Sequence, residues 1–342
     1  MNFKVDLSAK PFKRSWLRNT LIAILLLSGS QAGASCLVIS LQEKNDRILL
    51  QSGEDATVVE SRRPAKMISK EFRQIYEILE KNKKLDERFD ARLKGLSQEL
   101  FGPLIPAMRQ ASCIVFNIQP RFMHFALDLL PIDGEPLFVE KAIAFSFGAP
   151  KDQDQIPGFG AETRGLILRD PETDPDNGAG EVRAHYPESN LYAAKSAGPK
   201  LFAKANADFL LISAHGFVVP GFGANDGDKD DSVLLKEHMN ADEFGDAKFR
   251  LVYFDSCQLG LSKPFIDAAS RSGAHHYLAP IISNESGNSS TLTMRYFFAG
   301  LNQGQSSMDA LFSARKRIYQ DFRANSRSDQ IFYSYPFRLY LL

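Results

Sequence analysis

Two apolar runs decide the fold class of this chain: Phe209-Leu-Leu-Ile-Ser-Ala-His215-Gly216 and Arg250-Leu-Val-Tyr-Phe-Asp255-Ser-Cys257. Each run has the length and the β-branched or aromatic character of a strand that is buried on both faces of a sheet. The 42 positions that separate residues 215 and 257 leave room for a crossover between neighbouring parallel strands. We therefore expect an α/β fold in which both runs end at the same edge of a mostly parallel sheet.

The ends of these two runs carry a histidine and a cysteine. Functional groups collect where parallel strands reach their carboxyl ends, so we predict that Cys257 is a nucleophile and His215 its acid/base partner. The backbone N–H groups of Gly216 and Cys257 would stabilise the oxyanion. The alternative is that the cysteine is inert core filler. That interpretation fits Cys113 better than Cys257, which ends its run and is followed by the turn-like Gln258-Leu-Gly260.

Composition excludes several classes of protein. The 342 residues are 44% hydrophobic and 24% charged, as in ordinary globular proteins, and are enough for one large or two modest domains. With 41 basic and 41 acidic residues there is no basic surplus to drive nucleic-acid binding. Three widely spaced cysteines predict neither a disulfide framework nor a Cys-rich zinc site. We expect no cofactor and no metal.

The N-terminus has features of an export signal. An uncharged run from Asn19 to Gln42 contains the apolar stretch Leu21–Leu27 and then Ala32-Gly-Ala34, which has the small-residue spacing of a cleavage site. We expect residues 1–34 to be a cleaved signal of a periplasmic or secreted protein. An uncleaved membrane anchor and the leading helix of a cytoplasmic protein are the alternatives. Contact with a membrane is expected through the N-terminus only. The basic residues before the run are Lys4, Lys10, Lys13, Arg14 and Arg18.

The first half of the chain alternates irregularly between predicted strands and predicted helices. Residues 35–150 are expected to form one subdomain, which ends in the stretch Gly148–Gly160, rich in Gly, Pro and Asp. Its predicted elements are a hairpin at 36–41 and 47–50, a strand at 57–59, one long helix at 66–100, and strands at 113–118, 123–127 and 141–147.

Residues 151–342 alternate more regularly between strands and helices, which predicts a three-layer α/β/α sandwich. The predicted strands are 164–168, 190–193, 274–281 and 337–342, in addition to the two opening runs. One predicted helix starts near residue 181, and the others cover 199–206, 261–271, 289–301 and 307–322. Residues 170–178 are expected to be an exposed loop.

The order of motifs resembles CHAT-domain proteins, which are caspase-like peptidases of the caspase, separase and metacaspase superfamily. The resemblance runs from about residue 33 to the end. It implies a non-catalytic, caspase-like N-terminal subdomain, followed by a catalytic subdomain with the dyad. It rests on Phe101-Gly-Pro-Leu-Ile-Pro106, Met123-His-Phe-Ala-Leu127, Leu130-Pro-Ile-Asp-Gly-Glu-Pro-Leu137, Ala214-His215-Gly216, Ser256-Cys257-Gln-Leu-Gly260, Ser272-Gly-Ala274 and Gly304-Gln-Ser-Ser-Met-Asp-Ala310.

One position departs from that pattern. Two residues before the cysteine, where many CHAT domains carry serine, this chain has Asp255, and Asp255-Ser-Cys257 resembles the metacaspase cysteine motif. The resemblance implies that Asp255 lines the specificity pocket, where a carboxylate would pair with an Arg or Lys side chain of the substrate. The alternative is that Asp255 only caps a turn.

Other polar residues are weaker candidates. Alternating carboxylates from Asp226 to Asp231 resemble a calcium loop, but Asp231 stands where glycine is needed, and a solvated loop is the preferred interpretation. His124 is expected to be structural. His275 and His276 lack a ligand at metal-binding spacing. The polar loop Asn284–Ser290 is expected to border the cleft, without an assigned role.

Together these features predict a caspase-like cysteine endopeptidase that cleaves protein substrates after Arg or Lys. The rival interpretation is a catalytically silent CHAT domain that serves as a regulatory or interaction module. Both dyad residues are present, which favours the peptidase. An activating protein partner is compatible with either interpretation.

Overall fold

The computed structural model describes residues 36–53, 57–81, 84–148, 159–202, 205–219 and 231–342. Residues 35–342 form one compact unit. The predicted signal, residues 1–34, lies outside the described residues, and so does the predicted boundary at residue 150. Below, residues 36–148 are called the N-terminal half and residues 159–342 the C-terminal half.

The centre of the unit is an 11-stranded sheet. Its strands are β1 (Leu37–Lys44), β2 (Arg47–Ser52), β3 (Val58–Pro64), β4 (Cys113–Ile118), β7 (Ala142–Ser146), β8 (Gly165–Arg169), β9 (Asn190–Ala193), β10 (Phe209–Ser213), β14 (Leu251–Asp255), β15 (His276–Pro280) and β16 (Phe337–Leu341). Their order across the sheet is β3-β2-β1-β4-β7-β16-β15-β14-β10-β8-β9. All neighbours are parallel except the pairs β1–β2, β2–β3 and β15–β16.

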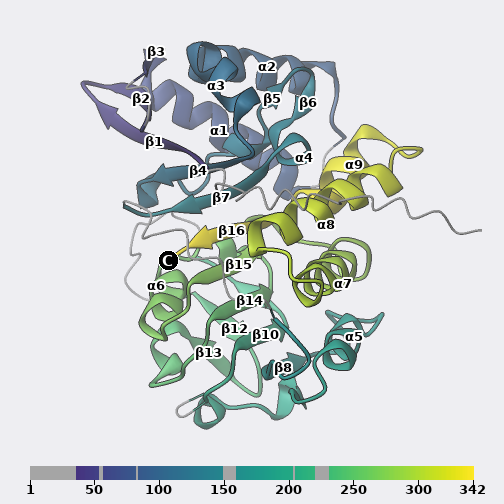
Figure 1. Ribbon diagram of the computed structural model, residues 1–342. Helices are drawn as coiled ribbons and strands as arrows, with labels where there is room; N and C mark the ends of the chain where they lie inside the picture. Colours follow the sequence, from purple (N-terminus) through teal and green to yellow (C-terminus); the bar gives the residue numbers. More distant parts are fainter. Residues whose placement is uncertain (1–35, 54–56, 82–83, 149–158, 203–204, 220–230) are drawn as a thin grey trace, which may run out of the picture. The chain divides into compact units, whose positions relative to one another are not determined.

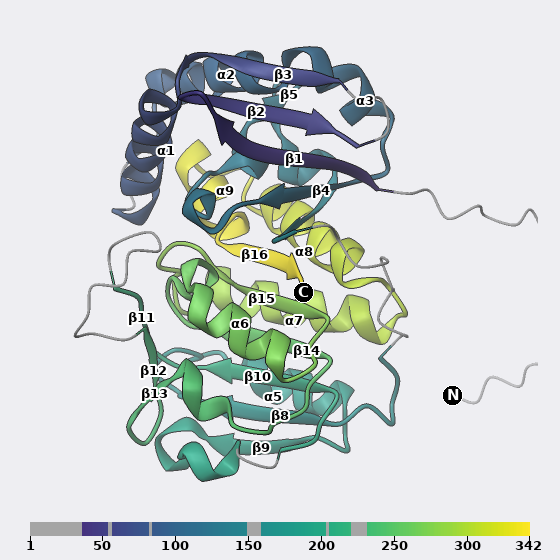
Figure 2. The same cartoon turned by 90° about the vertical axis from the view of Figure 1, so that its left-hand side faces the viewer.

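Helices flank the sheet (Figure 1). They are α1 (Ala65–Glu80), α2 (Glu87–Phe101), α3 (Ile105–Gln110), α4 (Leu137–Glu140), α5 (Gly178–His185), α6 (Lys263–Arg271), α7 (Asn288–Asn302), α8 (Ser307–Asp321) and α9 (Arg327–Ser334). The side chains of α1, α2 and α6 belong to one apolar core, and those of α5, α7 and α8 to a second core. Figure 2 shows α6 in front of β14 and β15, with α7 behind them. The predicted α/β fold with a mostly parallel sheet is confirmed.

Small sheets and 3₁₀ turns complete the unit. β5 (Pro131–Ile132) pairs with β6 (Glu135–Pro136), and β11 (Gly216–Phe217), β12 (Ser232–Leu234) and β13 (His238–Asn240) form a three-stranded sheet. The 3₁₀ turns are Gly102–Leu104, Pro120–Phe122, Leu127–Leu129, Ala194–Ser196, Pro199–Leu201, Ala241–Phe244 and Leu259–Leu261. The second small sheet continues directly from the histidine strand, so it adjoins the predicted dyad.

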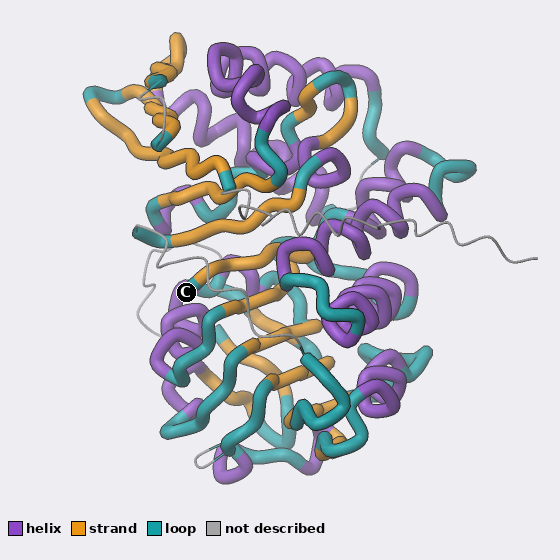
Figure 3. Tube along the Cα trace, in the orientation of Figure 1, coloured by secondary structure: helices purple, strands orange, loops and turns teal. Residues whose placement is uncertain are grey.

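The two halves of the chain share the sheet through β16. The last strand of the chain pairs in parallel with β7 of the N-terminal half, with Tyr340 opposite Phe145 and Leu341 opposite Ser146. On its other side β16 pairs with β15. The tube in Figure 3 shows the strands as one continuous stack through both halves. The two predicted subdomains are therefore halves of one sheet.

Four predicted elements are wrong. The long helix over 66–100 is two helices, because Asp86 caps a new helix by accepting a hydrogen bond from the backbone N–H of Phe89 at 2.9 Å. Residues 123–127 are turns rather than a strand. Of the helix expected over 199–206, the described residues form only the short turn Pro199–Leu201. The loop 170–178 is not exposed at Asp170, Thr173 and Asp174, which are buried.

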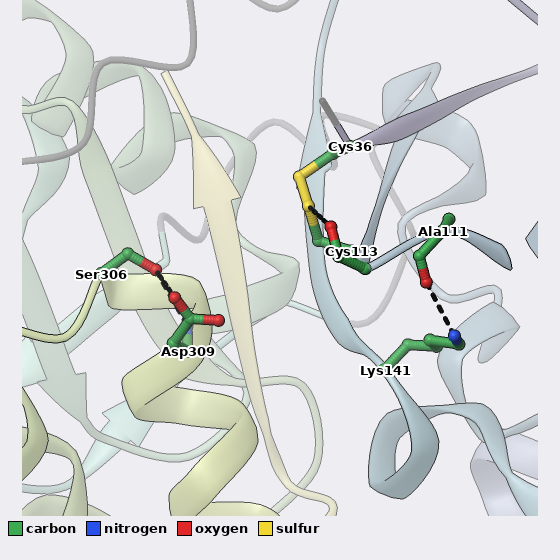
Figure 4. Close-up of a disulfide and its surroundings, with 7 residues drawn as sticks. Cys36, Ala111, Cys113, Lys141, Ser306 and Asp309 are labelled. Atoms are coloured by element: carbon green, nitrogen blue, oxygen red, sulfur yellow. Dashed lines mark hydrogen bonds between the residues drawn. A yellow bond between two sulfur atoms is a disulfide. The ribbon is translucent and has the colours of Figure 1, made fainter. Parts of the chain in front are cut away.

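The preferred interpretation of Cys113 as inert core filler is also corrected. Cys36 and Cys113 are bonded to each other, with their Cα atoms 4.6 Å apart (Figure 4). Their neighbours Leu37 and Ile114 lie opposite each other in the parallel pair β1–β4. The bond therefore joins the starts of two adjacent strands, and Cys113 is a disulfide partner rather than core filler. Only Cys257 is free.

A cluster of buried charged residues lies next to β16, the strand that joins the two halves. Asp128 and Arg338 are fully buried, and Arg315 is 3% exposed. Asp128 accepts hydrogen bonds from both guanidinium groups at 3.2 Å and from the Tyr335 hydroxyl at 3.0 Å. Arg338 also donates to the carbonyl oxygen of Phe125 at 3.0 Å. These bonds hold residues 123–128 as turns against β16 and explain the missing strand.

Asp128→Ala should lower the free energy of unfolding by about 3–5 kcal/mol, because it leaves two buried guanidinium groups without their carboxylate. Urea unfolding followed by circular dichroism measures the loss. The control is Asp133→Ala, which removes an exposed carboxylate that pairs with Arg109 on the surface. Equal stability of the Asp128 variant and the control would contradict a structural role for the buried cluster.

Candidate active site

The histidine and cysteine strands are neighbours in the sheet. β10 and β14 pair in parallel, with Phe209 opposite Leu251 and Ser213 opposite Asp255. Beyond the last paired residues, the backbone N–H of Ala214 donates to the carbonyl oxygen of Asp255 at 3.3 Å. His215 and Cys257 therefore leave the sheet at the same edge, two residues after equivalent positions.

Gly216 brings the two segments into contact. A Cβ atom on Gly216 would lie 2.6 Å from the carbonyl oxygen and 2.8 Å from the backbone nitrogen of Cys257. Such distances are too short for any side chain, so the close approach requires glycine. The backbone that follows His215 thus lies directly on the backbone of Cys257. The His215 side chain is exposed, and Cys257 is half-buried.

The turn after Cys257 is sharp and firmly held. Gln258 adopts the left-handed conformation with φ of 62°, which is strained for a residue with a side chain. The buried hydroxyl groups of Tyr277 and Tyr340 donate to the carbonyl oxygens of Leu259 at 2.8 Å and Gly260 at 2.7 Å. A Cβ atom on Gly260 would lie 2.7 Å from the carbonyl oxygen of Ala279. β15 and β16 therefore fix the position of the cysteine turn.

Burial raises the pKa of the Cys257 thiol, and nearby groups modify this effect. The backbone N–H of Asn284 lowers the pKa by hydrogen bonding to the sulfur, and the Ser283 side chain also lowers it. The charges of Asp255 and Glu80 raise it. Tyr76 lies one turn before Glu80 on α1. Burial raises the pKa of Tyr76 most, and the negative charges of Glu80 and Cys257 raise it further. The resting thiol is therefore protonated at neutral pH.

Asp255 is buried beside the cysteine, with 2% of its surface exposed. Its carboxylate accepts hydrogen bonds from the Ser213 hydroxyl at 2.6 Å, the Ser290 hydroxyl at 2.5 Å and the Asn284 side-chain amide at 2.6 Å. Burial raises its pKa to about 6, against the opposing influence of these bonds, and the charge of Asp174 raises it further. Each oxygen of the carboxylate thus already has a donor in this structure.

A second buried carboxylate lies close to the first. Asp174 accepts hydrogen bonds from the backbone N–H groups of Gly178 at 2.7 Å and Ala179 at 3.0 Å, at the start of α5, and from Arg169 at 3.0 Å. Ser213, which donates to Asp255, also contacts Thr173, the residue before Asp174, with their hydroxyl oxygens 3.2 Å apart. This network makes the floor of the site acidic and polar.

Sequence reasoning missed two contributors to the site. It assigned no role to the loop that begins at Asn284, yet the side-chain amide of Asn284 donates to the Asp255 carboxylate at 2.6 Å. It also placed no site residue in the N-terminal half, where Glu80 contacts Ser283. The polar composition of residues 284–290 indicated a cleft position but not a partner. Nothing in the sequence near Glu80 distinguishes it from the other acidic residues of α1.

The remaining candidates lie away from this cluster or outside the described residues. His124 and His276 are buried, and burial lowers their pKa to about 4 and about 3, respectively. Residues 220–230, with most of the acidic loop, are not described; Asp231 accepts a hydrogen bond from the backbone of Val219 at 2.9 Å. Within the described ranges, no three His, Cys, Asp or Glu side chains are grouped to hold a metal ion. None of the helices in those ranges has the length and apolar character to span a membrane.

Comparison with known proteins identifies the fold. No protein-family model matches the chain, and no curated protein matches its sequence. Among solved structures, a chain of the Saccharomyces cerevisiae separase–securin complex aligns with a TM-score of 0.58 and 9% identity, covering 89% of this chain and 30% of that chain. A structure described as a protease aligns with a TM-score of 0.47 and 8% identity, covering 76% of this chain and 69% of that one.

The separase alignment shows that this chain has a mixed α/β fold similar to the caspase-like fold of separase. The chain corresponds to less than a third of the length of that separase structure. The predicted caspase-like fold is thereby confirmed, while the finer assignment to CHAT-domain proteins stays a prediction.

Proposed function

We propose that this protein is a CHAT-type, caspase-like cysteine endopeptidase, with Cys257 as nucleophile and His215 as acid/base. The observation that carries the proposal is the contact of Gly216 with the backbone of Cys257. This contact packs the backbone that follows His215 against the backbone of Cys257, at the edge of the sheet where two parallel strands end. The caspase-like fold supports the same assignment.

In the proposed reaction the imidazole of His215 takes the proton of the Cys257 thiol. The thiolate sulfur attacks the carbonyl carbon of the scissile bond, and the N–H groups of Gly216 and Cys257 stabilise the oxyanion. Collapse of this intermediate breaks the C–N bond, and the imidazolium gives its proton to the departing amine. Water then hydrolyses the acyl-enzyme, with His215 as the base, and restores the thiol.

The rival proposal, a catalytically silent module, has one observation in its favour. Burial and two nearby carboxylates raise the pKa of the Cys257 thiol, so the resting site holds a protonated and weakly nucleophilic sulfur. A substrate or an activating protein partner would have to change this environment before the thiol could react. The separase of the aligned structure is in complex with securin, and a protein partner is also proposed for this chain.

Cys257→Ala and His215→Ala should each abolish peptidase activity, with losses of several orders of magnitude. Both side chains lie at loop-facing strand ends, so thermal unfolding monitored by circular dichroism should be nearly unchanged. Cleavage of a fluorogenic peptide with Arg before the scissile bond measures activity. Cys257→Ser is a size-matched second variant. Substantial turnover by any of these proteins would remove the dyad from the proposal, whereas no activity in wild type with any partner or peptide would favour the silent module.

Asp255 is proposed to select Arg or Lys before the scissile bond. Its carboxylate is buried at the end of β14, two residues before the nucleophile, and Asp174 adds a second negative charge nearby. A carboxylate that accepts three hydrogen bonds retains capacity for a further donor, because its two oxygens offer about four lone-pair sites. The alternative is that Asp255 has only a structural role. In that case its three hydrogen bonds serve only to hold together β10, α7 and residue 284.

Asp255→Asn should reduce kcat/KM for Arg and Lys peptides by about 30-fold or more, a loss of at least ~2 kcal/mol for a desolvated charge pair. In wild type, kcat/KM for Arg over citrulline peptides should fall as pH drops through about 6, because protonation removes the charge of Asp255. The variant should lack this dependence. Asp267→Asn, on the surface of α6, is the control. Unchanged selectivity with lower stability would assign Asp255 a structural role.

Export is proposed separately from catalysis. Residues 1–34 have the composition of a cleaved signal, and the disulfide between Cys36 and Cys113 supports an oxidising compartment such as the periplasm or the cell exterior. The membrane-anchored and cytoplasmic alternatives remain the other outcomes of the test.

Mature protein should begin near Ser35 and should be recovered outside the cytoplasm. N-terminal sequencing of the soluble protein from its native host measures the first point. Alkylation before and after reduction should label one and three cysteines, respectively, because only Cys257 is free. Soluble protein that starts at Met1 and exposes three thiols without reduction would support the cytoplasmic alternative.

A further inference from the structure

We propose that one face of the β11–β12–β13 sheet binds the departing segment of the peptide substrate, and that Phe217 on this face selects a large apolar side chain just after the scissile bond. The inference rests on the proposed function in treating His215 as the acid that protonates the departing amine. It adds a specificity-determining residue on the opposite side of the scissile bond from the Arg or Lys that Asp255 is proposed to select.

The register of β11 and β12 places His215 and Phe217 on one face of this sheet. Phe217 lies opposite Ser232 in the antiparallel pair. The backbone N–H of Leu234 donates to the carbonyl oxygen of His215 at 2.8 Å, so the pairing extends back to the histidine. Because side chains alternate between the two faces of a strand, His215 and Phe217 share a face, and Gly216 belongs to the other.

The two faces of the sheet differ in burial (Figure 2). Val233 and Met239 lie opposite each other in β12 and β13, and both are fully buried in the apolar core. Leu234 and His238 form the next pair, so their side chains belong to the face of His215. His215 and His238 are exposed on this face, and Leu234 between them is half-buried.

Phe217 is the apolar centre of the exposed face. It is 47% exposed, whereas every other phenylalanine of the described ranges is buried or half-buried. Its ring centroid lies 5.0 Å from that of His238. The buried Ser232 hydroxyl and Nδ1 of His238 are hydrogen-bonded at 3.0 Å, which fixes the imidazole against which Phe217 packs. A ring held in this way binds an apolar group with a small loss of conformational entropy.

The chemistry of the acid identifies the occupant of this face. The imidazolium of His215 gives its proton to the departing amine, so that nitrogen must come within hydrogen-bonding distance of the ring. The residue that carries the nitrogen therefore lies beside His215. Phe217 is two positions further along the strand, about 7 Å away, which is within reach of a large side chain on that residue. Contact between the two apolar groups removes surface of both from water.

Phe217→Ala tests the subsite in the full chain. The substrates are peptides with Arg before the scissile bond that differ only in the next residue, which is Phe, Leu, Ala or Asp. In wild type, kcat/KM should be at least about tenfold higher for the Phe peptide than for the Ala peptide, and Phe217→Ala should reduce this ratio to about 2 or less.

Two further variants serve as controls. Phe217→Leu retains a large apolar side chain and should keep most of the preference for Phe over Ala. Tyr192→Ala removes a 43% exposed aromatic side chain from β9 and should show the wild-type ratio. Circular dichroism melting of each variant identifies any loss of folding.

Two outcomes would overturn the proposal. One is an unchanged ratio in Phe217→Ala. The other is an equal loss of kcat/KM on all four peptides by the folded variant, which would give Phe217 a role in supporting His215 rather than in selection. A matching series that varies the residue before the scissile bond should respond equally in wild type and Phe217→Ala. A change confined to that series would place the contact on the wrong side of the bond.

A binding measurement distinguishes this inference from the proposed function. Fluorescence anisotropy of labelled peptides that begin with Phe or Ala reports occupancy of the face in a Cys257→Ala background. The Phe peptide should bind at least about fivefold more tightly, and adding Phe217→Ala should remove the difference. This result without peptidase activity in wild type would keep the subsite and reject the catalytic role. Peptidase activity without any dependence on Phe217 would do the reverse.

Discussion

The structure depends on the last strand of the chain, because β16 joins both halves into one sheet. Its backbone pairs with β7 on one side and β15 on the other. Arg338 extends from this strand into the interior, where Asp128 and backbone carbonyl oxygens receive its hydrogen bonds. A buried guanidinium is tolerated only with such partners, so the strand and residues 123–128 require each other. The same strand also provides Tyr340, whose hydroxyl holds the turn after the cysteine.

Much of the fold could be predicted from the sequence because buried parallel strands have continuous apolar runs. The histidine strand, the cysteine strand and the final strand all form where these runs are found. The failures arise where a polar residue acts through a distant partner. Asp128 makes turns of an apolar stretch by binding Arg338, which lies 210 positions away. The disulfide was not predicted for the same reason, because only the pairing of β1 with β4 brings Cys36 close to Cys113.

The candidate site was predictable to a similar degree. Strand ends in a parallel sheet share an edge, so the proximity of residues 215 and 257 follows from topology alone. Topology does not determine which loops approach that edge. Ser283 and Asn284 reach it because β15 is the neighbour of β14, and Glu80 reaches it because α1 packs on the same face as α6. The sequence carries no local signal for contacts of this kind, since each depends on two surfaces that form only after folding.

The disulfide also determines how the N-terminal half behaves after backbone cleavage. Cys36 and Cys113 enclose β1, β2, β3 and the first three helices within one covalent loop. That loop contains many lysine and arginine residues, including the charged surface of α1 and α2. A single cut within it leaves the two polypeptide pieces linked, so gel electrophoresis without reductant would show one band of unchanged mass. Nicking of this region, by the protein itself or by another enzyme, becomes visible as separate fragments only after reduction.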